Sequence, residues 1–193
     1  MSISTSKAEK RLIAEQARQI GARRLLEVGA FKGKTTAVLS RVAHETGGYV
    51  VAIDPMRWAS KPANLPEWID TVLHPFSYER AFWRNIAQRG HPERVWLERT
   101  LSSNEVLLHS EAKHLQEFDL AFIDGEHLYD AVIADFENWG KRVRPGGKIL
   151  FHDCIKRFPE VIAAVQEIAA KPGYALTAPC NGATIATIDV LGT

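Results

Sequence analysis

Leu25 to Thr36, with the sequence LLEVGAFKGKTT, is the stretch that decides the fold of this chain. Apolar residues up to Val28 predict a buried strand, and the glycines after it predict a tight turn. The polar residues that follow the second glycine begin a helix. A strand, a glycine turn and a helix N-terminus together present backbone N–H groups to a nucleotide-like cofactor.

Outward from this stretch, helical and strand patterns alternate along the chain. Helices are expected at 7–20, 35–45, 77–88, 103–117, 129–143 and 159–170. Strands are expected at 25–29, 49–54, 95–100, 118–125, 148–153, 174–178 and 183–190. The strands are too uniformly apolar for one wet face, which indicates a parallel sheet covered by helices on both sides. The sequence therefore predicts a doubly wound α/β fold, with a mostly parallel seven-stranded sheet ending in an antiparallel strand pair.

Finer features of this prediction concern turns and helix ends. Ser102 or Ser103 is expected to cap the helix at 103–117, and Arg144 to Gly147, RPGG, to form a tight turn before the fifth strand. Residues 1–21 are expected to carry a surface helix. Residues 55–76 contain four prolines and two tryptophans without a sustained period, which predicts a lid or acceptor-binding loop.

Composition bounds the class of protein. The 193 residues are 46% hydrophobic and 24% charged, which predicts one globular domain spanning 1–193. A formal net charge of +1 gives no reason to expect nucleic acid or an anionic membrane as a partner. We expect a cytoplasmic protein, because the sequence shows neither a secretory signal nor a membrane-spanning run, and a homo-oligomer is compatible with it. Cys154 and Cys180 are expected to be small buried side chains rather than part of a disulfide framework.

Three cofactor classes compete for the glycine turn. A dinucleotide fingerprint needs a second glycine where this chain has Phe31. A phosphate loop needs four residues before its GK[ST] triplet, and only three separate Gly29 from Gly33. A nucleotide hydrolase that uses Lys34 stays open as an alternative. Glu27 would repel phosphates but suits a cationic amino-acid group, and Asp54 at the end of the next strand suits ribose hydroxyls. S-adenosylmethionine presents both groups.

At this point the sequence resembles the class I S-adenosylmethionine-dependent methyltransferases over nearly its whole length. The segments IDGEHLYDAVIADFENW (123–139) and VRPGGKILFHD (143–153) are similar to the small-molecule O-methyltransferase group that includes the macrocin and cephalosporin-pathway enzymes. The resemblance implies a Rossmann-like methyltransferase fold and a small hydroxylated acceptor. It implies cofactor contacts from the first glycine turn, the ribose acid and two later strand ends: Glu27, Gly29, Ala30, Phe31, Gly33, Thr35, Asp54, Pro55, Ser102 and Asp124.

A second group of polar residues follows the fourth and fifth strands. Asp124 and Asp153 end these strands, as Glu27 and Asp54 end the first two. Because the carboxyl ends of neighbouring parallel strands border one crevice, we expect the four acids to share it. The resemblance implies metal ligands at Asp124 and Asp153, but where relatives often have a second acid this chain has His152. Carboxylates favour magnesium, whereas imidazole favours zinc or manganese, so the identity of a divalent cation stays open.

His127 lies three residues after Asp124, and the ordinary histidine pKa of about 6.5 suits a general base. A histidine that caps the next helix is the alternative. The leading hypothesis is an O-methyltransferase with His127 as base. A methyltransferase-like protein that binds cofactor without catalysis stays open as well, because one acid of the metal pattern is missing.

Overall fold

The structure is a computed structural model that describes residues 5–56, 77–178 and 184–192. In this part of the chain seven strands form one sheet. They are β1 (Arg24–Val28), β2 (Tyr49–Ile53), β3 (Val95–Glu98), β4 (Phe118–Ile123), β5 (Val143–Phe151), β6 (Tyr174–Ala178) and β7 (Ala186–Val190).

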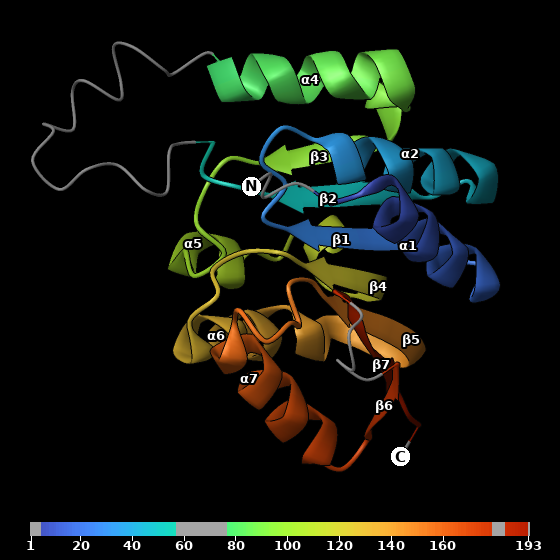
Figure 1. The fold of residues 1–193 in the computed structure, drawn as a ribbon. Coiled ribbons are helices and arrows are strands. Elements are labelled where there is room, and N and C mark those ends of the chain that lie inside the picture. The colour runs from blue at the N-terminus through green and yellow to red at the C-terminus, as the bar shows by residue number, and fades with distance from the viewer. Residues whose placement is uncertain (1–4, 57–76, 179–183, 193) are drawn as a thin grey trace, which may run out of the picture.

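The strand order is β3-β2-β1-β4-β5-β7-β6, which can be followed from top to bottom in Figure 1. β1 to β5 pair in parallel, and β7 pairs antiparallel with both β5 and β6. The predicted mixed sheet is thereby confirmed. The chain leaves β1 toward β2 on one side and later returns to β4 on the other, so β1 and β4 flank the point where strand order reverses. In doubly wound folds, ligands bind at this point, outside the carboxyl ends of the strands.

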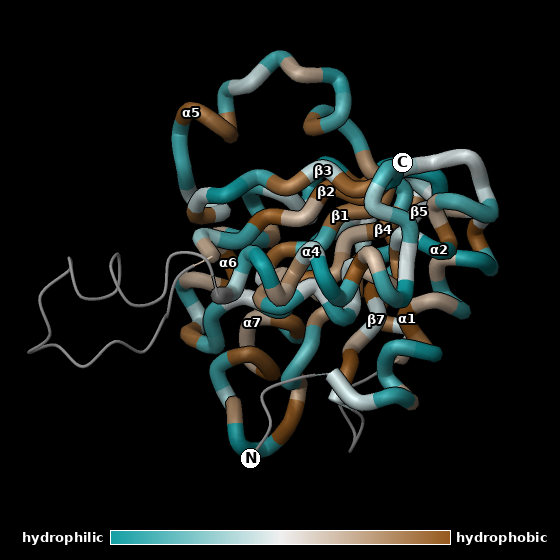
Figure 2. The backbone as a smooth tube through the Cα atoms, turned by 90° about the horizontal axis from the view of Figure 1, so that it is seen from above, coloured by the Kyte–Doolittle hydropathy of each residue, from teal (hydrophilic) through white to brown (hydrophobic). Residues whose placement is uncertain are grey.

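Helices cover both faces of the sheet. They are α1 (Lys7–Gln19), α2 (Lys34–Thr46), α4 (Ser77–Arg89), α5 (Glu105–Leu108), α6 (Tyr129–Asn138) and α7 (Pro159–Ala170), with 3-10 turns at Pro92–Arg94, Lys113–Leu115 and Gly140–Arg142. Figure 2 shows α6 and α7 on one side of the strands and α1 and α2 on the other. Within the described residues, no helix is long and apolar enough to cross a membrane.

Alternate residues of each central strand enter two separate cores. Leu25 of β1 packs with α1 and α2, whereas its neighbour Leu26 packs with α6 and α7. In β4, Phe122 and Ile123 divide in the same way. All four side chains are almost completely buried, and each burial contributes roughly 1.5–3 kcal/mol. This two-sided burial explains why the strands are apolar at nearly every position.

Two predicted helices are shorter than expected. In place of a helix at 103–117 there is a single turn, capped by Asn104 rather than by Ser102 or Ser103. The Asn104 carboxamide starts the turn by accepting from Leu107 N. Beyond the turn, Ser110 Oγ accepts from Ala112 N, and such a side-chain bond competes with helix propagation. The helix predicted at 129–143 ends at Asn138 and continues as a 3-10 turn.

Two further expectations are corrected. The RPGG segment belongs to β5 as an irregularity: Val143 pairs with Phe118 and Lys148 with Leu120, so the residues between them bulge, and Gly146 has φ +79°. Cys154 is fully buried as expected, but it is disulfide-bonded rather than a simple apolar side chain. Cys180 and the 57–76 part of the predicted lid loop lie outside the described residues.

Candidate active site

The loop after β1 meets the end of β4 at Gly29. A Cβ at this position would lie 2.0 Å from the carbonyl oxygen of Asp124, and its φ is +87°. Glycine is therefore the residue that this approach requires. The Gly29 amide also donates to Ile53 O at 2.9 Å, which ties the loop to β2. The glycine turn, β2 and β4 thus meet where strand order reverses.

Asp54 holds the same loop from the end of β2. One carboxylate oxygen accepts from Phe31 N at 2.7 Å, and the other accepts from Met56 N at 2.6 Å. Burial raises the pKa of Asp54, and the two N–H donors oppose that rise. Phe31 and Met56 have φ values of +45° and +53°, a region that costs a non-glycine residue about 1–3 kcal/mol. The Asp54 carboxylate fixes both strained residues.

Glu27 points into the helix layer. Its side chain is 2% exposed, and its carboxylate accepts from Thr36 Oγ1 of α2 at 2.5 Å. Burial raises the pKa of Glu27 well above its ordinary value, with further contributions from the nearby Asp124 and Asp54. Three of the four predicted strand-end acids are therefore close enough to influence one another. Glu27 also anchors the start of α2 to β1.

The remaining residues predicted to contact a cofactor differ in accessibility. Ala30 and Thr35 are each 4% exposed, and Thr35 Oγ1 lies 2.7 Å from Thr5 Oγ1. Phe31 is 46% exposed, with its ring 5.2 Å from that of Tyr78. Gly33 has φ +67° and precedes α2. Pro55 is partly buried beside Asp54. The loop therefore exposes the Phe31 side chain, while Ala30, Gly33 and Thr35 are buried.

Ser102 is fixed by α6. Its hydroxyl donates to Asp135 Oδ1 at 2.6 Å, and its carbonyl oxygen accepts from the Trp139 indole at 2.8 Å. Asp135 also lies next to Gly125, where a Cβ would stand 3.0 Å from its Oδ2. Burial raises the pKa of Asp135 to about 6. Ser102 thus lies beside the end of β4.

The second group of predicted residues forms one connected cluster. His152 Nδ1 lies 2.9 Å from Asp124 Oδ1 and 3.5 Å from Asp153 Oδ2. His127 Nε2 lies 2.8 Å from Asp153 Oδ2, and the His127 ring stacks on Phe158 with centroids 4.2 Å apart. Asp153 has φ +53°, a third strained position at a strand end. Asp124, His127 and His152 line a small pocket at the ends of β4 and β5, and Asp153 bonds to both histidines beside it.

Electrostatics favour a positive charge at the centre of this cluster. Burial of the His152 ring disfavours its charged form, but bonds with Asp124 and Asp153 outweigh that effect and raise the pKa of His152 to about 10. Burial raises the pKa of Asp124. For Asp153, burial acts in the same direction, but His152 and His127 outweigh it and lower the pKa. The arrangement is suited to holding a cation among carboxylates.

Glu9 of α1 is a site residue that the sequence did not identify. Its carboxylate lies 3.3 Å from His152 Nε2 and accepts from the Thr184 hydroxyl. The only sequence signal is the S-x-x-E pattern from Ser6 to Glu9, which predicts a capping box, and that capping box is present. The helix predicted as a surface element therefore also supplies a carboxylate to the cluster.

The donor set at this cluster fits a divalent metal ion, which would replace the proton on His152 Nδ1. Ligand atoms of Asp124, His152 and Asp153 all lie within 4.8 Å of one another. A metal-binding histidine usually directs its other ring nitrogen to a carboxylate, and His152 directs Nε2 to Glu9. Two carboxylates with one imidazole suit zinc or manganese better than magnesium.

The family follows from a comparison with known proteins. A model of the methyltransferase-domain family matches residues 26–154, which is more than half of the chain and includes the glycine turn and Asp153. The chain belongs to this methyltransferase family. The match confirms the family resemblance drawn from the sequence, and it favours a methyltransferase over a nucleotide hydrolase that uses Lys34.

Individual relatives of this methyltransferase are distant. An uncharacterized protein, R132, of Acanthamoeba polyphaga mimivirus is 27% identical over 147 residues, covering 75% of this chain and 58% of that protein. An uncharacterized protein, y4gI, of Sinorhizobium fredii is 51% identical over only 35 residues, or 18% of this chain and 4% of that protein. The chain thus spans less than two thirds of the length of these curated relatives.

Solved structures show the same fold. The O-methyltransferase TomG from Streptomyces achromogenes, determined with S-adenosylmethionine, matches with a TM-score of 0.72 at 19% identity, covering 98% of this chain and 82% of that one. An O-methyltransferase from Bacillus cereus, determined with S-adenosylhomocysteine, matches with a TM-score of 0.71 at 21% identity, covering 100% and 84%. These matches confirm the Rossmann-like methyltransferase fold.

Proposed function

We propose that this chain transfers a methyl group from S-adenosylmethionine to a hydroxyl of a small metabolite, with a divalent cation at the acceptor. The observation that carries the proposal is that two groups of residues, one for the cofactor and one for the acceptor, meet at the point where strand order reverses. A glycine turn held by Asp54 lies on one side, and the His127–Asp153 pair lies on the other. The TomG and Bacillus cereus structures support the choice of cofactor and reaction.

The cofactor would lie across the ends of β1, β2 and β4. Each Asp54 oxygen accepts one backbone N–H and keeps a second lone pair for a ribose hydroxyl. The turn formed by Gly29, Phe31 and Gly33 would border the methionine part and contribute its shape, because its N–H groups already bond to Ile53 O, Asp54 Oδ2 and Ala30 O. Asp124 would supply negative charge toward the cofactor's amine and sulfonium, and the buried Glu27, bonded to Thr36, would hold the start of α2 beneath them. Pro55 and Ser102 would border the adenosine.

Two of the proposed cofactor residues would act from beneath the loop. Ala30 and Thr35 are buried, and Thr35 pairs with Thr5. Their contribution is the shape and rigidity of the turn.

Methyl transfer would then need one proton acceptor. With the Nε2–H of His127 donated to Asp153, the Nδ1 lone pair can take the proton of the acceptor hydroxyl. The hydroxyl oxygen forms a bond to the methyl carbon as the carbon–sulfur bond breaks, and neutral S-adenosylhomocysteine leaves. Stacking on Phe158 keeps the imidazole in one orientation.

Asp124, His152 and Asp153 would hold the cation. When bound, a divalent ion lowers the pKa of an adjacent hydroxyl and fixes its direction. Glu9 would orient His152 through Nε2. We further propose that the protein is cytoplasmic, acts on no nucleic acid and assembles, if at all, as a homo-oligomer.

The test is a methyl-transfer assay with labelled S-adenosylmethionine and a panel of hydroxylated acceptors, including catechols and sugars. We expect labelled product with at least one acceptor, an increase on adding manganese or zinc to metal-free protein, and loss in His127→Ala. His109→Ala, which changes a histidine on α5's C-cap, is the matched control. Tight cofactor binding without turnover across the panel would favour the non-catalytic alternative.

A further inference from the structure

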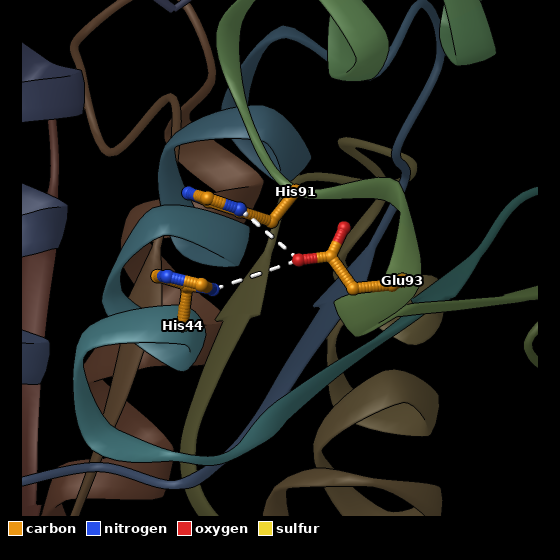
Figure 3. A group of neighbouring side chains, drawn as sticks. All are labelled: His44, His91 and Glu93. Atoms are coloured by element: carbon orange, nitrogen blue, oxygen red, sulfur yellow. Dashed lines mark hydrogen bonds and ion pairs between the residues drawn. The ribbon is translucent and has the colours of Figure 1, made fainter.

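Three side chains far from the candidate active site point toward one another. Figure 3 shows His44 on α2 facing His91 and Glu93, which lie in the segment after α4. His91 Nδ1 lies 3.1 Å from Glu93 Oε1, and His44 Nδ1 lies 3.5 Å from the same oxygen. Two ring nitrogens thus share one carboxylate oxygen.

This cluster lies near the amino ends of the parallel strands, whereas the candidate active site lies at their carboxyl ends. The helix α2 starts at the glycine turn and is 13 residues long, with His44 in its last turn. At a rise of about 1.5 Å per residue, His44 lies roughly 15 Å along the helix from its first residue. The cluster therefore adjoins the beginnings of β2 and β3, whereas the Asp124–His152–Asp153 group adjoins the ends of β4 and β5.

The backbone holds His91 firmly against α2. The His91 amide donates to Ser40 Oγ at 2.9 Å, and Ser40 is fully buried. Gly90 packs so closely that a Cβ there would lie 2.3 Å from Ser40 Oγ. Pro92 then opens a 3-10 turn, closed by Arg94 N donating to His91 O at 3.0 Å. The position of the cluster is thus set before any ligand arrives.

The donor atoms match the requirements of a transition metal. The three ligand atoms lie within 4.8 Å of one another. In a tetrahedral zinc site, zinc–nitrogen distances of about 2.0–2.1 Å place neighbouring ligand atoms roughly 3.3 Å apart. The separations of 3.1 Å and 3.5 Å bracket this value. We propose that His44, His91 and Glu93 bind a divalent transition-metal ion of the zinc, nickel or copper class, the metals that imidazole favours.

Metal binding at this site must change the orientation of the rings. The two imidazoles stack with centroids 3.7 Å apart and planes 5° from parallel, so their Nδ1 lone pairs run side by side. For one ion to bond to both nitrogens, the rings must tilt so that the two Nδ1 lone pairs converge on it. The His44 and His91 side chains are 49% and 34% exposed, which leaves room for this tilt. The site would thereby join the end of α2 to the turn before β3.

The nearby arginine side chains bond to backbone carbonyl oxygens rather than to Glu93. Arg41 donates to Arg89 O at 2.7 Å, and Arg94 donates to Gly48 O at 3.4 Å. The ion pairs that Glu93 forms within the described residues are those with the two imidazoles. The carboxylate thus faces the two ring nitrogens rather than an arginine.

The experiment is a titration of metal-free full-length protein with Zn²⁺ by calorimetry and with Co²⁺ by visible absorption. We expect His91→Ala and His44→Ala to lose one bound equivalent, and Glu93→Gln to weaken that equivalent at least about tenfold. His109→Ala is the matched control and should bind as the wild type does. Asp153→Asn separates the two sites, because the equivalent lost in His91→Ala should persist in it.

Thermal unfolding gives an independent readout. Saturating Zn²⁺ should raise the Tm of Asp153→Asn by about 2–4 °C or more, and this rise should vanish when His91→Ala is added. Identical metal stoichiometry in the wild type and His91→Ala would overturn the proposal. So would the complete loss of metal binding in Asp153→Asn alone. Neither result contradicts the proposed methyl transfer.

Discussion

The loop that follows β1 is held by backbone geometry, whereas the cluster at the ends of β4 and β5 is held by side chains. Gly29 and Gly33 provide left-handed turns, and Asp54 fixes two backbone N–H groups. The other half depends on bonds between His152, His127 and three carboxylates, one of them from α1. Both halves lie at the same edge of the sheet, where strand order reverses.

We infer from this difference that the two halves have different roles, cofactor binding in the first and chemistry in the second. A backbone cradle can bind a cofactor common to a whole family, because its geometry depends on few side chains. A side-chain cluster can change its charge and metal preference by one substitution, as with the histidine before Asp153. We therefore expect variants of the first half to change cofactor affinity or stability, and variants of the second to change chemistry or metal use.

The largest effect is expected for His127→Ala. Removal of a general base typically costs 10²–10⁴-fold, and we expect a loss of about that size in kcat with cofactor affinity within about twofold of wild type. Single-turnover kinetics together with cofactor titration measure the two quantities. An equal loss in cofactor affinity would contradict the division between the halves.

Glu9→Ala tests the remote support of the cluster. Loss of a carboxylate that orients a metal-binding histidine typically costs 10–100-fold in metal affinity, and we expect a weakening of about that size. Metal competition with a chromophoric chelator measures it. Glu15→Ala, on an exposed part of the same helix, is the matched control. Unchanged metal affinity would show that α1 does not support His152.

Asp135→Asn gives a pH-dependent change in stability. The pKa of Asp135 in the folded protein, about 6, lies above the ordinary value. The contribution of this carboxyl group to the free energy of unfolding is therefore greatest below about pH 4 and is lost as the pH rises through 6. Asparagine avoids this loss and still accepts from Ser102. At pH 7.5 we expect the variant to be more stable by about 2 kcal/mol, with the difference vanishing near pH 4. Denaturant unfolding across this pH range measures the effect, and a variant less stable at pH 7.5 contradicts the sign.

The smallest effect is expected for Thr36→Val. The substitution keeps the shape of the side chain and removes the hydroxyl that donates to the buried Glu27 carboxylate. We expect a loss of about 1 kcal/mol in the free energy of unfolding. Thr46→Val, where the hydroxyl donates to backbone carbonyls at the other end of α2, provides a comparison. A more stable Thr36→Val would show that the hydroxyl does not support Glu27.

The sequence predicted the first half better than the second, for a physical reason. Left-handed glycines, apolar strands and strand-end acids are local patterns, so the sheet and the place of Asp54 after the end of β2 followed from them. The partners of His152 come from opposite ends of the chain, and no local pattern indicates that Glu9 reaches it. The 103–117 helix was predicted too long because Asn104 rather than Ser102 caps its start and the Ser110 hydroxyl bonds the backbone just past its first turn.

Calorimetric titration with S-adenosylhomocysteine, in the wild type and in Asp54→Asn, tests the central claim most directly. Asparagine can accept only one of the two N–H bonds that Asp54 accepts from Phe31 and Met56, because its NH₂ group is a donor. We predict one binding site in the wild type and at least about tenfold weaker binding in the variant. The absence of binding to the wild type at millimolar ligand, or equal affinity in both proteins, would contradict the account.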